Sequence, residues 1–121
     1  MKLSGVAMVK NEQDIIEVFV RHNLKYLDSL HLIDHDSFDE TGLILSKLKE
    51  EGLPITIEVE KKLEHWSEKY ITKLARKIFY NYNPDFIFLL DADEFIKINS
   101  RRCLEESLLT LETCIPAILY L

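Results

Sequence analysis

The sequence predicts an α/β domain built on a parallel sheet, with helices packed on both of its faces. Short apolar segments of strand length alternate along the chain with longer segments whose apolar residues recur at helical spacing. Strands alternating with helices indicate right-handed βαβ units. With 121 residues, of which 47% are hydrophobic, residues 1–121 are expected to form a single domain, because a second core does not fit.

Four short apolar segments are predicted to be the strands of this sheet: residues 3–9, 30–33, 55–59 and 86–90. The last of them, FIFLL, is apolar at every position, which predicts a central strand covered on both faces. Residues 117–121 are expected to form a further strand.

The predicted helices lie between and after these strands. An apolar stripe runs through residues 15–27, and residues 70–79 carry a similar stripe that ends before Asn83 and Pro84. Ser37 and Glu40 have the spacing of a capping box, which predicts that the second helix begins there and ends near Gly52. A fourth helix is expected over residues 100–111.

Charge and composition narrow the function classes. The formal net charge of -6 leaves no basic stripe for a phosphate backbone, so nucleic acid is not an expected partner. Cys103 and Cys114 lack CxxC spacing and are expected to be buried free thiols, which fits a reducing cytoplasm. No apolar run is long enough to span a bilayer, and residues 1–8 lack the features of a signal peptide. A soluble, cytoplasmic protein is expected.

Polar side chains follow three of the predicted strands. Ligands of parallel α/β sheets bind outside the carboxyl ends of the strands, so these clusters are candidate site residues. The clusters are Asn11 with Glu12, Asp34 with Asp36, and Asp91 with Asp93 and Glu94. Helix capping explains Asn11 equally well, and turn formation explains Asp34 and Asp36.

The third cluster carries the strongest chemical signal. Asp91 and Asp93 lie one residue apart directly after an apolar strand, and such carboxylates repel each other unless a cation lies between them. Mg²⁺ and Mn²⁺ accept carboxylate oxygens and keep open positions for substrate phosphates. Asp91 and Asp93 are therefore the predicted ligands of a divalent metal, either Mn²⁺ or Mg²⁺.

Three segments resemble the family-2-like glycosyltransferases. VAMVKNEQDII is similar to their first strand and loop, DHDSFDET (34–41) to their second-strand signature, and FIFLLDADEF (86–95) to their apolar strand and D-x-D motif. The segments occur in the family's order, and the resemblance covers the whole chain. It implies a Rossmann-like GT-A fold and, here, the donor-binding part of a metal-dependent inverting glycosyltransferase.

The resemblance also implies roles for individual residues. Asn11 and Glu12 would lie beside the nucleotide, with Asp34, and Asp36 of the same signature, near the base. Asp91 would approach the ribose or sugar, and Asp93 would ligate a metal that bridges the phosphates. The expected donor is a nucleoside-diphosphate sugar, in the first place a UDP-sugar, and the acceptor is an unknown glycan or a lipid-linked hydroxyl compound.

Arg76 lies on the helix before the D-x-D strand, where the family often has a basic residue facing the nucleotide. A solvent-exposed helix charge is the equal alternative. Asp36 stands where the family pattern has Gly, and this replacement is expected to change the turn. The family continues beyond the D-x-D strand into the region that supplies the general base, whereas this sequence stops at Leu121, so the catalytic base is unknown.

Other functions remain as alternatives. A sugar-phosphate nucleotidyltransferase would have a Gly-rich phosphate loop after its first strand, and VKNEQD contains no Gly. A phosphatase with an aspartyl nucleophile carries its D-x-D after the first strand instead of the fourth. The third alternative is a non-catalytic nucleotide-sugar-binding or subunit-assembly module that forms a homo-oligomer through an open sheet edge. Peripheral membrane attachment follows only by analogy with lipid-linked acceptors.

Overall fold

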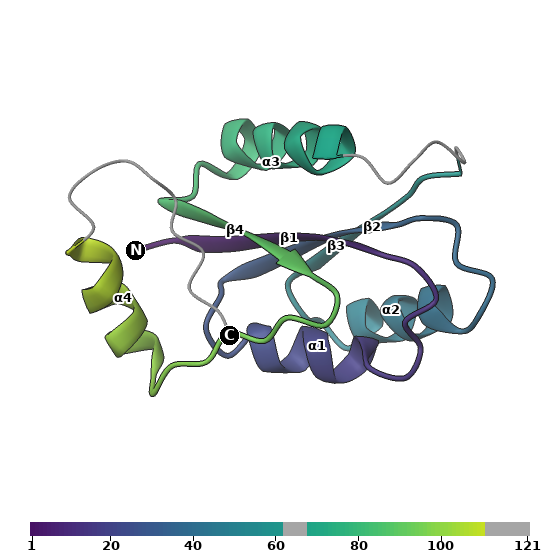
Figure 1. The fold of residues 1–121 in the computed structure, drawn as a ribbon, viewed down its shortest axis with the longest axis horizontal. Coiled ribbons are helices and arrows are strands. Elements are labelled where there is room, and N and C mark those ends of the chain that lie inside the picture. The colour runs from purple at the N-terminus through teal and green to yellow at the C-terminus, as the bar shows by residue number, and fades with distance from the viewer. Residues whose placement is uncertain (62–67, 111–121) are drawn as a thin grey trace.

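The computed structural model describes residues 1–61 and 68–110. Its parallel sheet has the strand order β3-β2-β1-β4 and consists of β1 (Leu3–Val9), β2 (Ser29–Asp34), β3 (Ile55–Val59) and β4 (Phe86–Asp91). The helices are α1 (Ile16–Asn23), α2 (Thr41–Glu50), α3 (Glu68–Tyr82) and α4 (Arg101–Leu109). Helices α1 and α2 lie on one face of the sheet and α3 lies on the other (Figure 1). The predicted α/β class, with helices on both faces, is confirmed.

The start of α2 differs from the prediction. Ser37 and Glu40 do not form a capping box, because α2 begins only at Thr41. The N-cap position is Glu40, and the preceding Asp39 accepts a hydrogen bond of 2.8 Å at its Oδ1 from the Thr41 N–H. Helix α1 is also shorter than predicted, ending at Asn23 where the chain enters a turn. The predicted strand at 117–121 and the end of the predicted fourth helix lie outside the described residues.

Strand β4 is not central within the described part of the chain. Among the described residues it pairs with β1, on one side only. Phe88 and Leu90 are buried, whereas Leu89 is 41% exposed. Because residues 117–121, predicted to form a further strand, lie outside the described residues, a central place for β4 stays a prediction.

Two hydrophobic cores hold the sheet between the helical layers. The larger one joins the sheet to α1, α2 and α4, and includes Phe19, Leu45 and Leu104. The smaller one joins the sheet to α3 and is made of Val6, Met8, Ile33, Leu74 and Ile78. Burying an apolar side chain of this size contributes about 1.5–3 kcal/mol. The carboxyl ends of the strands therefore extend from a rigid platform.

Helix α4 is fixed near the amino-terminal end of β1. Ser100 is its N-cap, with Oγ accepting from the Cys103 N–H at 3.1 Å. Arg101 pairs with Asp28 at 2.9 Å and donates to the carbonyl of Met1 at 2.6 Å. Cys103 is a free thiol that is only partly buried, and Cys114 lies outside the described residues. None of the helices in 1–61 and 68–110 has the length and apolar character needed to cross a membrane.

One row of paired residues crosses the sheet near its carboxyl edge. Met8 in β1 pairs with Asp91 in β4 and with Ile33 in β2, and Ile33 pairs with Glu58 in β3. Met8 and Ile33 pack in the core under α3, and partners in parallel strands share a face, so the whole row faces α3. Neighbouring strands lie about 4.8 Å apart, which gives this register row a length of about 14 Å.

Candidate functional site

A polar hollow lies at the Asp91 end of the register row. It has a volume of about 380 Å³ and is lined by Met8, Lys10, Glu12, Asp91, Ala92 and Asp93. Asp91 and Asp93 are exposed, whereas Ala92 between them is buried. The structure therefore brings three predicted residues together with Lys10, which the sequence analysis did not select. We call this place the D-x-D hollow.

The turn that carries the two aspartates is held by hydrogen bonds. Glu94 Oε1 accepts from the Asp91 N–H at 2.7 Å, and the Glu94 N–H donates to the Asp91 carbonyl at 2.9 Å. The buried Asn23 of α1 donates to the Glu94 carbonyl at 3.1 Å and accepts from the Ile96 N–H at 2.9 Å. The carboxylate of Glu94 thus shapes the turn, and Asp91 and Asp93 are the carboxylates of this turn that line the hollow, together with Glu12 from the loop after β1.

The electrostatics of the D-x-D hollow are unfavourable for anions without a cation. The pKa of Glu12 is raised, first by burial and then by the negative charge of Asp93, with smaller effects from Asp39 and Asp14. Like charges at close range oppose ionisation, and a bound cation would relieve this repulsion. Lys10 is the basic side chain in the lining.

The described residues contain no group of three or more His, Cys, Asp and Glu side chains arranged to hold a metal ion. The donors that do fit are the pair Asp91 and Asp93, whose hard carboxylate oxygens suit Mg²⁺ or Mn²⁺. Such ions commonly take one or two protein carboxylates and complete their coordination with water and substrate phosphates. Metal binding by Asp91 and Asp93 therefore stays a prediction, and it would need water and a substrate diphosphate to complete the coordination.

The loop after β1 and the loop after β2 are joined by hydrogen bonds that run in both directions. Main-chain N–H groups of the first loop donate to side chains of the second: Asn11 to Ser37 Oγ at 2.9 Å, Glu12 to Thr41 Oγ1 at 2.8 Å and Gln13 to Asp39 Oδ2 at 3.3 Å. In return, Asn11 Oδ1 accepts from the Phe38 N–H at 3.0 Å and Gln13 Oε1 from the Glu40 N–H at 3.1 Å. We call this arrangement the loop clasp.

Two residues of these loops have left-handed backbones. The φ angle is 51° at Asn11 and 49° at Asp36. Asn and Asp tolerate this region better than other non-glycine residues. Asp36 thus adopts a left-handed backbone, which Gly also favours, and a change of the turn relative to the family stays a prediction. Its side chain is exposed, and a contact with the nucleotide stays a prediction.

Asp34 lies on the other face of the sheet from the D-x-D hollow. It pairs with Val9, which belongs to the core under α1 and α2, and it is only 5% exposed. Its Oδ1 accepts from the Ser37 N–H at 3.0 Å, and a Cβ on Gly42 would lie 3.2 Å from its Oδ2. Asp34 thus shapes the second loop, and its contact with a base stays a prediction.

Arg76 does not join the other predicted residues. It lies midway between the buried Leu74 and Ile78, so the 3.6-residue period places it on the opposite, solvent side of α3. This position fits the alternative of an exposed helix charge. The helical period already indicated it, since the apolar stripe of α3 was visible in the sequence.

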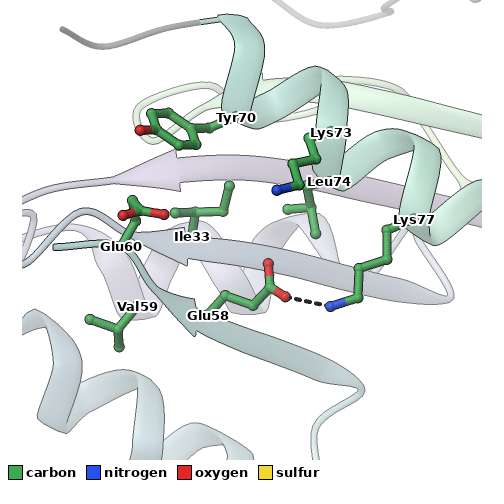
Figure 2. A pocket seen from close by; sticks show the side chains of 8 residues that line it. All are labelled: Ile33, Glu58, Val59, Glu60, Tyr70, Lys73, Leu74 and Lys77. Carbon is green, nitrogen blue, oxygen red and sulfur yellow. Dashed lines mark hydrogen bonds and ion pairs between the residues drawn. The ribbon is translucent and has the colours of Figure 1, made fainter. Parts of the chain in front are cut away.

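A second hollow lies at the Glu58 end of the register row, between β3 and α3. It measures about 510 Å³ and is lined by Ile33, Glu58, Val59, Glu60, Tyr70, Lys73, Leu74 and Lys77. Figure 2 shows Lys73 and Lys77 extending from α3 toward β3, with Lys77 Nζ 2.6 Å from Glu58 Oε1. The sequence analysis missed this second hollow, because its residues come from a strand and a helix with no motif.

Comparison with known proteins supports the fold. No family model and no curated protein sequence matches the chain. The mannosyltransferase PcManGT from Pyrobaculum calidifontis, solved in complex with GDP-Man and Mn²⁺, has a TM-score of 0.72 and 17% identity over 93% of this chain. S. aureus TarS 1-349 has a TM-score of 0.60 and 17% identity over 90% of this chain.

These neighbours define the class of fold, which is that of the GT-A-type glycosyltransferases. The matched region covers 32% of each neighbour's chain, so this chain spans about a third of their length. At 17% identity the likeness concerns the fold, and the activity requires an argument from the site.

Proposed function

We propose that this chain is the donor-binding part of a glycosyltransferase, which binds a nucleoside-diphosphate sugar with Mn²⁺ or Mg²⁺ for transfer of the sugar to an acceptor hydroxyl. The observation that carries the proposal is the register row from Asp91 to Glu58, which links the two hollows along the carboxyl edge on one face of the sheet. Ligand sites of such sheets lie at this edge.

The two hollows differ in chemistry, and the diphosphate and the nucleoside of a nucleoside diphosphate differ in a similar way. The D-x-D hollow offers carboxylates for a metal and Lys10 for phosphate oxygens. The second hollow offers apolar contacts from Ile33 and Leu74, the ring of Tyr70 and charged groups. Its volume of about 510 Å³ lies in the range typical of small-molecule sites. We place the diphosphate in the D-x-D hollow and the nucleoside in the second hollow.

The loop clasp supports a metal-dependent way of binding phosphate. Phosphate loops use free main-chain N–H groups, but those of Asn11, Glu12 and Gln13 already donate to the second loop. Diphosphate at this edge must therefore be neutralised by a metal and by Lys10. The engaged N–H groups favour a transferase with a metal-bound diphosphate leaving group over a nucleotidyltransferase with a Gly-rich loop.

Roles in the transfer follow from this placement. Asp91 and Asp93 would hold the metal, which when bound stabilises the negative charge that grows on the leaving diphosphate. Lys10 lies on the same hollow and would contribute in the same sense. An inverting transfer also needs a base for the acceptor hydroxyl. We assign no base among the described residues, and the acceptor, a cytoplasmic location and peripheral membrane attachment stay predictions.

The second candidate function is a non-catalytic binding or assembly module. The observation that favours it is the open edge of β4 within the described residues, where Leu89 is 41% exposed. Edge strands pair readily with other chains. This candidate predicts a concentration-dependent oligomer whose formation needs neither metal nor nucleotide, which analytical ultracentrifugation measures directly.

Isothermal titration tests the main proposal. UDP and GDP are titrated into the protein with and without Mn²⁺, and both nucleotides are used because one structural neighbour was solved with GDP-Man. We expect binding of at least one nucleotide that needs Mn²⁺ and is lost in Asp93→Asn. Glu106→Gln, a change at an exposed carboxylate on α4, is the matched control and should bind as the wild type does. Absence of binding by the folded wild-type protein would overturn the proposal.

A further inference from the structure

Asn11 occupies a special place in the loop clasp. Its N–H donates to Ser37 Oγ, its Oδ1 accepts from the Phe38 N–H, and its own backbone is left-handed with φ 51°. A residue here must therefore supply a side-chain acceptor and also tolerate positive φ. Asn meets both requirements. The side-chain carbonyl that was predicted to lie beside the nucleotide is already engaged by the second loop.

The neighbours of Asn11 in the chain face the D-x-D hollow. Lys10 precedes it and Glu12 follows it, and both line the hollow with Asp91 and Asp93. The clasp holds the main chain on either side of these residues, since the Glu12 N–H donates to Thr41 Oγ1, and Thr41 is fully buried at the start of α2. The direction of Lys10 and Glu12 is therefore set by hydrogen bonds to the second loop.

We propose that Asn11 is a positioning residue: through the loop clasp it holds Lys10 and Glu12 at the D-x-D hollow, and so sets the affinity for metal and diphosphate without touching the nucleotide. This inference rests on the proposed function. It assigns to Asn11 a different role from the one implied by the family resemblance, and it makes the second loop part of the phosphate site.

Two variants open the clasp from opposite sides. Asn11→Gly keeps the left-handed backbone accessible but removes the acceptor for Phe38. Thr41→Val keeps the shape of a buried side chain but removes the acceptor for Glu12. Ser100→Ala is the matched control, because it removes the N-cap of α4, away from the clasp, and costs a comparable amount of stability.

Two measurements are made on each variant at a temperature where all are folded. Hydrogen exchange of the Glu12 and Phe38 amides reports whether the clasp is open, and titration with UDP and GDP in the presence of Mn²⁺ reports affinity. We expect faster exchange of these amides in Asn11→Gly and Thr41→Val and an affinity weaker by about five- to tenfold, as for loss of one hydrogen bond. Ser100→Ala should change neither quantity.

The outcomes distinguish a failure of the positioning role of Asn11 from a failure of the proposed function. Wild-type affinity in variants whose amides exchange faster would overturn the positioning role, as would unchanged exchange in Asn11→Gly. Weakened affinity in Ser100→Ala as well would also overturn it, because the effect would then follow general stability. Failure of the wild-type protein to bind either nucleotide would instead overturn the proposed function, and with it this inference.

Discussion

The carboxyl group of Glu12 lies in the field of Asp93, and both line the D-x-D hollow. The two residues come from loops far apart in the sequence, one after β1 and one after β4. Burial first, and the negative charge of Asp93 second, raise the pKa of Glu12, as expected for a carboxyl group that lies beside another carboxylate.

The first prediction concerns this pKa. Asp93→Asn removes one negative charge beside Glu12, so the pKa of Glu12 should fall, and added Mg²⁺ should lower the wild-type value in the same direction. The measurement is a pH titration of the Glu12 side-chain carboxyl by NMR. Glu106→Gln should leave the value unchanged. An identical Glu12 titration in wild type and Asp93→Asn would show that the two groups do not interact.

The second prediction compares two basic residues of α3. Lys73 lines the second hollow, whereas Arg76 lies on the solvent side of the same helix. Lys73→Ala should weaken metal-dependent nucleotide binding by about fivefold, roughly 1 kcal/mol. Arg76→Ala should not weaken it. Titration calorimetry measures the nucleotide affinity of the two variants. A larger loss of affinity in Arg76→Ala than in Lys73→Ala would support the nucleotide-facing role that the family resemblance implied for Arg76.

The third prediction concerns acid stability. His31 is 1% exposed and packs against the ring of Tyr82. Its two ring nitrogens form hydrogen bonds with Ser29 Oγ at 3.0 Å and Thr56 Oγ1 at 2.7 Å. Burial lowers the pKa of His31 to about 4, against a partly opposing effect of Glu58. The folded state therefore resists protonation of a side chain that the unfolded state protonates near pH 6.5.

Proton binding determines the direction in which the free energy of unfolding changes with pH. Between pH 6.5 and about 4 the unfolded chain binds a proton at His31 that the folded chain does not, so the free energy of unfolding falls as the pH falls through this window. The contribution should be on the order of 2 kcal/mol. Urea unfolding of wild type and His31→Gln should show a stability difference that is constant above pH 7 and shifts in favour of the variant by that amount toward pH 4. A difference independent of pH would contradict this account.

The sequence predicted the β1 and β3 boundaries and the α/β order because apolar runs and turn residues are local signals. It placed Asp91 and Asp93 at a strand end for the same reason. It did not show on which face Asp34 lies, since this depends on the pairing of Asp34 with Val9. Residue pairing is a tertiary property.

The loop clasp and the second hollow could not be predicted from local sequence patterns either, because both depend on residues that are distant in the sequence. Helix capping was the alternative for Asn11, but its side-chain oxygen accepts from the Phe38 N–H, on the loop after β2. Lys73 has no distinguishing sequence context, and its place in the lining of the second hollow follows from the tertiary arrangement of α3 on the sheet. For Arg76 the sequence left two roles open, and the helical period of Leu74 and Ile78 favours the exposed helix charge over the nucleotide-facing role, which stays a prediction.

The most direct test of the central claim is to map a bound nucleoside diphosphate by NMR on the labelled protein. UDP and GDP are added with Mg²⁺, and then with Mn²⁺, whose unpaired electrons broaden nearby signals. The account predicts Mn²⁺ broadening centred on Asp91 and Asp93, and Mg²⁺-dependent shifts that extend along the register row through Met8 and Ile33 to Glu58. Shifts confined to another surface, or broadening that does not involve Asp93, would contradict it.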